Sequence, residues 1–122
     1  MNTQPTTPSL LPHETLDVYH LALEFHRALR PLARQRGFAN LRDQMTRAAE
    51  SIVLNIAEGA GRTSRDDKRR FYEIAMGSTI ECAAVLDCLR NRAAIAPQTH
   101  QDCRALAIRL YQILSRLTGP PR

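Results

Sequence analysis

Residues 55–75 read NIAEGAGRTSRDDKRRFYEIA, and this stretch decides how the chain folds. Gly59 and Gly61 are typical of a helix end, because glycine adopts the backbone conformations that terminate a helix. Ser64 followed three positions later by Asp67 is typical of a helix start, since the serine hydroxyl can accept a hydrogen bond from a free backbone amide. The stretch therefore predicts two helices joined by a short turn.

The same pattern extends in both directions, because apolar residues recur every three or four positions along most of the chain. We expect helices over residues 14–36, 41–58, 65–92 and 97–117. Asn40 with Asp43 repeats the cap spacing and predicts the start of the second helix. Thr99 with Asp102 does the same for the fourth. Pro31 should kink or shorten the first helix, because proline removes a backbone hydrogen bond.

Each expected helix has an apolar stripe that should face the core. In the first two helices the inward residues are expected to be Val18, Ala22, Phe25, Leu29, Leu32, Leu41, Met45, Ala48, Ile52 and Ile56. In the last two they are expected to be Phe71, Ile74, Ser78, Val85, Leu89, Cys103, Leu106, Leu110, Ile113 and Leu117. Four such helices with short connections predict an all-α fold, an antiparallel up-down four-helix bundle.

The chain has the size and composition of one globular domain, with 122 residues, of which 43% are hydrophobic and 24% charged. Pro5, Pro8 and Pro12 indicate a flexible tail over residues 1–13, so the bundle should occupy residues 14–118 and a C-terminal tail residues 119–122. The odd set of three cysteines is typical of a reducing compartment. No membrane-length apolar run or signal peptide is evident, so we expect a soluble, cytoplasmic protein.

No constellation in the sequence indicates an enzyme. Gly59 and Gly61 have the first spacing of a dinucleotide fingerprint, but they follow a helix instead of a strand. His20 and His26 are six positions apart, whereas metal-binding pairs on a helix need three or four. No GxSxG elbow surrounds a serine. We therefore expect no catalytic residue, no cofactor and no metal.

Five cations around the junction are the strongest functional signal: Arg62, Arg65, Lys68, Arg69 and Arg70. Residues 62–70 carry a net charge of +3, and positive charge at a helix start opposes the helix dipole. Arg65, Lys68 and Arg69 share one helix face, where they can contact consecutive phosphates of structured RNA or another polyanion. The alternative is a solvated charged face that serves only solubility.

Four further arginines are secondary candidates for the same contact: Arg42, Arg47, Arg104 and Arg109. They are equally compatible with contacts between subunits or with solvation. Residues 82–86 and the fourth helix carry more apolar surface than one core stripe needs, which favours a homo-oligomer over a monomer with a wider core. Gly77 in the middle of the third helix predicts a close helix crossing.

Three segments together resemble a known family: LDVYHLALEF, LRDQMTRAAESIVLNIAEGAGR and FYEIAMGSTIECAAVLDCL. The chain is similar to the four-helix-bundle proteins encoded in intervening sequences of bacterial large-subunit ribosomal RNA genes. That family is similar in turn to the accessory variability proteins of diversity-generating retroelements. The resemblance covers residues 16–117, and its most specific elements are NIAEG at residues 55–59 and Gly77, Ser78 and Glu81.

The resemblance implies an up-down bundle that assembles as a ring-shaped homopentamer. The retroelement relatives bind nucleic acid and a reverse transcriptase, whereas the intervening-sequence members, which this chain resembles more, have no established biochemical activity. Our hypothesis is a non-enzymatic oligomer that binds RNA or another nucleic acid through the basic junction. The alternative is a protein adaptor or assembly scaffold without direct nucleic-acid binding, for example an accessory protein to a reverse transcriptase.

Overall fold

The computed structural model describes residues 10–119, and this part of the chain contains helices and loops but no strand. A short 3-10 turn, η1 (Pro12–Thr15), precedes α1 (Asp17–Ala33), α2 (Ala39–Gly61), α3 (Arg65–Asn91) and α4 (Pro97–Thr118). The predicted all-α class is confirmed. Among these helices none combines the length and the apolar character that crossing a membrane requires.

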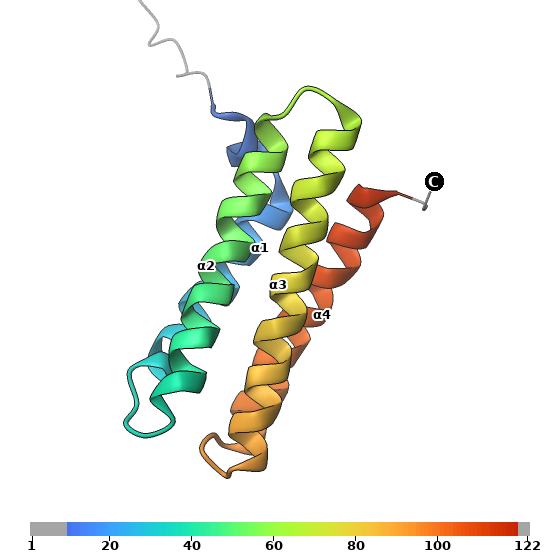
Figure 1. The fold of residues 1–122 in the computed structure, drawn as a ribbon. Helices are drawn as coiled ribbons and strands as arrows, with labels where there is room; N and C mark the ends of the chain where they lie inside the picture. The colour runs from blue at the N-terminus through green and yellow to red at the C-terminus, as the bar shows by residue number, and fades with distance from the viewer. Residues whose placement is uncertain (1–9, 120–122) are drawn as a thin grey trace, which may run out of the picture.

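The four helices form two layers, with α2 and α3 in one and α1 and α4 in the other (Figure 1). Successive helices run in opposite directions, which is the up-down arrangement that the sequence predicts. One end of the bundle, here called the junction end, holds the α2–α3 turn at residues 62–64, and the described chain also begins and ends there. The opposite end, here called the base end, holds the loops at residues 34–38 and 92–96.

Each helix contributes buried side chains to one continuous core. In α1 and α2 these include nearly all of the predicted residues. In α3 the stripe is displaced, because Ile74 is 45% exposed while Tyr72 and Ala75 are buried. In α4 Leu117 is 43% exposed and Leu114 is buried. Both helices carry apolar residues on two faces, so spacing alone does not tell which face is inward.

The predicted start of α3 is confirmed, and that of α2 is wrong. Ser64 Oγ accepts a hydrogen bond of 3.0 Å from the backbone amide of Asp67. α2 begins ahead of Asn40, after Phe38, whose backbone is left-handed with φ of 56° and whose side chain makes no cap. The position of this start depends on Arg42, which binds the preceding loop from within α2.

The predicted start of α4 at residue 97 is confirmed, but the N-cap is Ala96 and not Thr99. Pro97 suits the first helical position, where no amide hydrogen is needed. α1 ends at Ala33, so Pro31 shortens this helix. Within the tail predicted for residues 1–13, Pro12 already begins η1. The rest of the tail predictions concern residues 1–9 and 120–122. These lie outside the described residues.

The predicted close helix crossing at Gly77 is also wrong. Gly77 is exposed, and a Cβ atom added there would meet nothing within 4 Å. A Cβ atom added at Gly59 would instead lie 2.8 Å from Cε1 of Tyr72. The close approach between α2 and α3 is therefore at Gly59, next to the junction end.

Candidate nucleic-acid interface

The α2–α3 turn brings the five predicted cations together at the junction end, but Lys68 faces inward. Its Nζ atom donates hydrogen bonds to the carbonyl oxygens of Gly59, at 3.3 Å, and Ala60, at 3.0 Å. These carbonyls belong to the last turn of α2, where Gly59 also accepts a hydrogen bond of 3.2 Å from the backbone amide of Arg62. Lys68 therefore caps the C-terminus of α2. It does not form a solvent-facing stripe with Arg65 and Arg69.

Two more of the five cations pair with acids one helical turn away. Arg62 Nη2 lies 3.0 Å from Glu58 Oε2, and Arg69 Nε lies 2.8 Å from Glu73 Oε1. Residues 58–73 thus hold five cations and four carboxylates, a net charge of +1. Exposed pairs of this kind contribute about 0.2 to 1 kcal/mol, so a phosphate can compete for either guanidinium.

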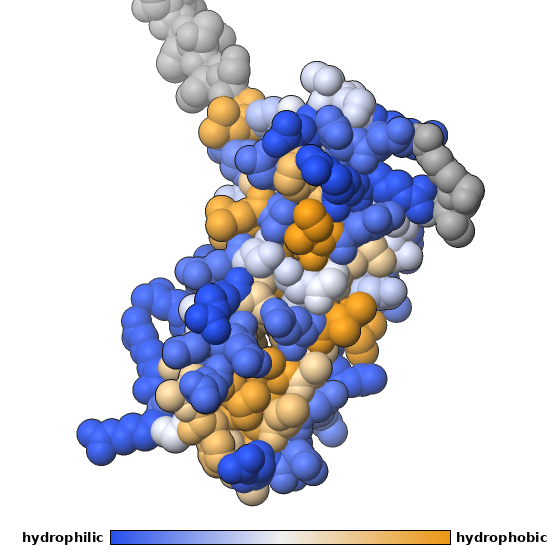
Figure 2. All heavy atoms as spheres, in the orientation of Figure 1, coloured by the Kyte–Doolittle hydropathy of each residue, from blue (hydrophilic) through white to orange (hydrophobic). Residues whose placement is uncertain are grey.

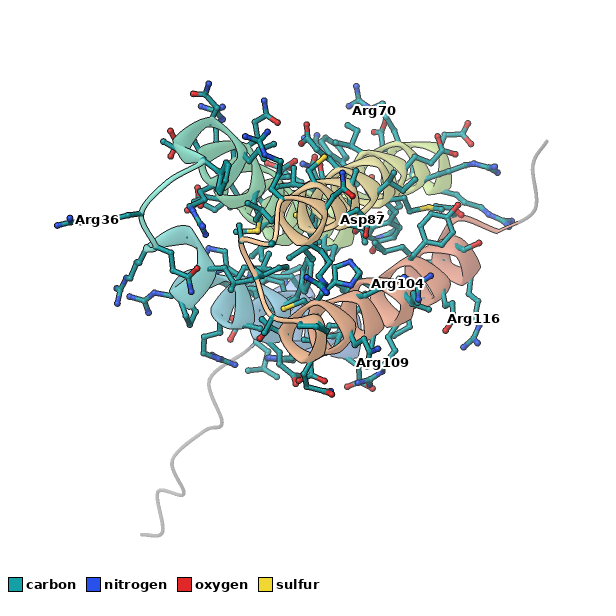
Figure 3. The ribbon with its side chains drawn as sticks, turned by 90° about the horizontal axis from the view of Figure 1, so that it is seen from below. Arg36, Arg70, Asp87, Arg104, Arg109 and Arg116 are labelled. Carbon is teal, nitrogen blue, oxygen red and sulfur yellow. The ribbon has the colours of Figure 1, made fainter. Side chains whose placement is uncertain are left out.

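Phe71 organises the remaining part of the junction. Its half-buried ring lies under two guanidinium groups, with the ring centroid 4.7 Å from Arg62 Cζ and 4.8 Å from Arg70 Cζ. Arg70 points away from the bundle on the outer side of α3 (Figure 3). Arg65 and Arg70 are both exposed, and within residues 10–119 neither forms an ion pair with an acid. We define the junction surface as Arg62, Arg65, Arg69 and Arg70.

The sequence reading left Phe71 out of the cluster. Its position directly after the cation run was the available signal, because a ring on the helix surface can hold neighbouring guanidinium groups by cation–π contact. Such contact limits the rotamers of Arg62 and Arg70 before any ligand arrives.

Arg42 has to be removed from the secondary candidates. Its side chain is 3% exposed, and its Nε atom donates to the carbonyl oxygen of Gly37 at 2.6 Å. Its Nη1 atom donates to the carbonyl oxygen of Leu32 near the end of α1. A guanidinium enclosed in this way holds the α1–α2 loop and cannot reach a phosphate.

The other secondary candidates are exposed but lie apart from the junction. Arg104 lines a hollow between α3 and α4 together with Asp87 (Figure 3). Arg109 points outward from the layer formed by α1 and α4 (Figure 3). Arg47 lies on the lower half of α2, closer to the base end. None of the three joins the junction surface.

Two apolar grooves run along opposite flanks of the bundle. The α3/α4 groove, of about 420 Å³, includes Ile80, Ala83, Asp87, Arg104, Ile108 and Tyr111. The α1/α2 groove, of about 330 Å³, is lined by Leu23, His26, Glu50, Val53 and Leu54. Figure 2 shows further hydrophobic side chains interrupting the hydrophilic surface of the α2 and α3 layer.

The two buried cysteines, Cys82 and Cys103, serve packing. Burial, with a smaller contribution from Glu81, raises the pKa of the Cys82 thiol to about 12. Burial and the neighbouring Asp102 raise the pKa of Cys103 as well. Both thiols are therefore protonated at neutral pH and behave as small apolar side chains. Within residues 10–119, no group of three or more histidine, cysteine or acidic side chains is placed to hold a metal ion.

Fold and surface together define a helical-bundle protein with a basic turn and two apolar flanks. Residues 14–116 match the family model of the 23S rRNA-intervening sequence protein, and the chain belongs to this family. A solved structure with the same fold is that of a protein of unknown function from the S23 ribosomal protein family of Bacteroides thetaiotaomicron. The two align with a TM-score of 0.79 and 22% identity over 84% of this chain and 99% of that chain. No curated protein matches the sequence.

Proposed function

We propose that this protein is a non-enzymatic, cytoplasmic homo-oligomer that binds nucleic acid through the junction surface. The observation that carries the proposal is the pair of guanidinium groups, from Arg62 and Arg70, held on the ring of Phe71. A guanidinium presents several donors in a planar fork that matches a phosphate. Because the ring already restricts two of these side chains, less conformational entropy is lost when they bind.

The contact at one junction surface would be weak, because the acids nearby reduce the local charge. Arg62 and Arg69 must exchange Glu58 and Glu73 for a phosphate. Several copies of the surface in one oligomer would bind a single nucleic acid with an avidity far above that of one copy. Self-association is therefore part of the proposal.

The two apolar grooves support a head-to-tail oligomer, because they lie on opposite flanks and their residues follow the same order along the bundle. His26 and Glu50 border the α1/α2 groove, while Asp87 and Arg104 border the α3/α4 groove. In both grooves the charged residues lie nearer the base end and the apolar residues nearer the junction end, as the helix directions require. Two copies standing side by side with the same orientation would place α2 of one copy against α3 of the next and α1 against α4, so the apolar residues of the two grooves would cover each other.

A head-to-tail contact of this type closes into a ring when the rotation between copies permits it. All junction surfaces would then lie on the same side of the ring, which suits a common polyanion. The family resemblance indicates five copies.

Nucleic-acid binding is tested by measuring the affinity for a labelled RNA hairpin over a range of salt concentrations. Phosphate contacts give a linear fall of log affinity with log salt, with a slope of about 0.7 to 0.9 for each contact. We expect Arg65→Glu with Arg70→Glu to weaken binding and to reduce the slope by about 1.5. Arg27→Glu with Arg109→Glu makes the same charge change on exposed residues of α1 and α4 and should retain a steeper slope. Equal slopes for the two variants would overturn the junction assignment.

Oligomer formation is tested by placing a charge in each apolar groove. Light scattering should show a smaller mass for Leu54→Glu or Ile80→Glu alone, because each variant would bury an unpaired charge in the contact between copies. If either single variant keeps the parent mass, the head-to-tail arrangement is wrong.

A protein adaptor or assembly scaffold is the second candidate, and the α3/α4 groove favours it. Ile80 is 56% exposed and Tyr111 is 41% exposed, and both can be covered by a partner helix, including one from a reverse transcriptase. An oligomer that binds no RNA hairpin at any salt concentration would support the scaffold in place of nucleic-acid binding.

A further inference from the structure

The base end carries a second group of arginines, collected around the first half of α2 from separate parts of the chain. We define the α2-base surface as Arg30 from α1, Arg36 from the α1–α2 loop, Arg47 from α2 and Arg92 from the α3–α4 loop. These positions are separated in the sequence by up to 62 residues, counting from Arg30 to Arg92, so the cluster has no signature as a run.

The contacts of Arg92 and Arg30 place them on either side of α2. The Arg92 guanidinium lies 4.7 Å from the centroid of the Phe38 ring, and Arg92 lines a hollow of about 330 Å³ with Phe38, Asn40 and Leu41. Arg30 lines a smaller hollow with Thr46 and other residues of α1 and α2. Arg92 thus lies beside the first turn of α2, and Arg30 lies beside its third turn.

Arg36 and Arg47 complete the surface. Arg36 points away from the bundle at the α1–α2 loop (Figure 3), and Arg47 is exposed on α2. Asp43 is an exposed acid within this part of α2, and the first turn of α2 holds no acid. Within residues 10–119 none of the four arginines forms an ion pair, which contrasts with Arg62 and Arg69 at the junction.

We infer that the α2-base surface binds the phosphate backbone of nucleic acid as a second contact, separate from the junction surface. From Leu41 to Arg47 the helix rises about 9 Å, which is close to the length of duplex axis that three phosphates of one strand occupy, at about 3.4 Å each. Four unpaired guanidinium groups around this length can contact consecutive phosphates without releasing an acid first. The inference rests on the proposed nucleic-acid function and adds a site to it.

The two surfaces should act independently, because the length of α2 separates them. Its 23 residues extend about 34 Å, several times the screening length of about 8 Å at physiological salt. Changes at the two ends should therefore add in their effects on binding free energy.

The experiment uses Arg36→Glu with Arg47→Glu, because these two side chains are exposed and hold no part of the fold. The probe is the labelled RNA hairpin, and the control is Arg27→Glu with Arg109→Glu, which has the same net charge. We expect the α2-base variant to bind about tenfold more weakly than the control at low salt, with a salt slope lower by about 1.5. Light scattering should show the parent mass for both variants.

Each other outcome has a definite meaning. If the parent binds RNA and the α2-base variant equals the control, this inference fails while the junction proposal stands. If the parent binds no RNA, the inference fails together with the proposed function. If polyglutamate displaces the hairpin from the parent as well as unlabelled RNA does, the surface recognises acidic chains in general, and the assignment to nucleic acid is overturned.

Discussion

Both ends of α2 are held by a cation that donates hydrogen bonds to backbone carbonyl oxygens, but only one of these cations is buried. At the base end, Arg42 is 3% exposed and binds the carbonyls of Leu32 and Gly37. At the junction end, half-buried Lys68 binds the carbonyls of Gly59 and Ala60. The base end therefore depends on an enclosed charge, and the junction end on a cation that water can partly replace.

The loops at the two ends differ in the same sense. The junction turn lies between the two glycines at the end of α2 and the serine-capped start of α3, and no residue of this turn has a left-handed backbone. The base end holds both left-handed residues other than glycine within residues 10–119, Phe38 with φ of 56° and Ala93 with φ of 57°. Such conformations are held by surrounding contacts. A cation near a loop can therefore be part of the fold or free to bind a ligand, and its sequence position does not distinguish the two roles.

Replacement of Arg42 tests the enclosed contact and should have the largest effect. Arg42→Met removes the side-chain donor to the Gly37 carbonyl and leaves the Leu32 carbonyl with backbone donors alone, so the free energy of unfolding should fall by about 3 kcal/mol. Urea denaturation measures the change. Arg47→Met, on the exposed side of the same helix, should stay within about 0.5 kcal/mol of the parent. Equal effects of the two variants would show that the base end does not depend on Arg42.

A methyl group at Gly59 tests the packing beside the junction. The new Cβ would lie 2.8 Å from the Tyr72 ring, so Gly59→Ala should destabilise the protein by about 2 kcal/mol. Gly61→Ala adds the same atom where nothing lies within 4 Å, and it should leave stability unchanged or raise it by less than about 1 kcal/mol. Thermal unfolding of the pair gives the comparison. A mild effect at Gly59 would mean that α2 and α3 can separate there without difficulty.

Lys68 and Arg65 should separate the two roles of junction cations. Lys68→Met removes the donors for the end of α2 and should lower stability by about 1 kcal/mol, while the salt dependence of RNA binding stays the same. Arg65→Met should leave stability unchanged and reduce the salt slope by about 0.8. Denaturation and binding curves are measured on both variants. The reverse pattern would restore Lys68 to the nucleic-acid surface.

Gly77, midway between the two ends, should give the smallest effect. Gly77 lies in the middle of α3, is exposed to solvent, and has open space where a Cβ atom would be. Gly77→Ala should therefore raise the free energy of unfolding by up to about 1 kcal/mol. Calorimetry at matched protein concentration and light scattering measure stability and mass together. A gain in stability with a loss of mass would show that another copy approaches α3 closely at this point, outside the two grooves.

The fold was predictable from the sequence because its signals are local. Spacing of three and four residues marks the helices, and the cap formed by Ser64 and Asp67 marks a boundary that the structure confirms. The core faces of α3 and α4 were not predictable in full, since both helices carry apolar residues on two sides. The start of α2 depends on a contact between Arg42 and Leu32, ten positions apart, which no local pattern encodes.

The candidate site was predictable only in part, for a related reason. The net charge predicted for the cluster covered residues 62–70 only. It therefore left out Glu58 and Glu73, which lie one helical turn away from their arginine partners. The spacing of Arg65, Lys68 and Arg69 places them on one helix face, so the sequence predicts a common stripe. The carbonyls that Lys68 binds belong to another helix, and spacing within α3 does not reveal them. The α2-base surface collects arginines from segments far apart in the sequence and becomes visible only in three dimensions.

The described chain begins and ends at the junction end. Arg65 Nη2 lies 3.4 Å from the position that a Cβ atom of Gly119 would occupy. We expect an affinity tag or fluorescent fusion attached at either terminus to lie near the junction surface and to shield it. A sensor chip that captures the protein by such a tag would therefore present the base end to the analyte, so capture through an engineered cysteine on α1 would give the fairer assay.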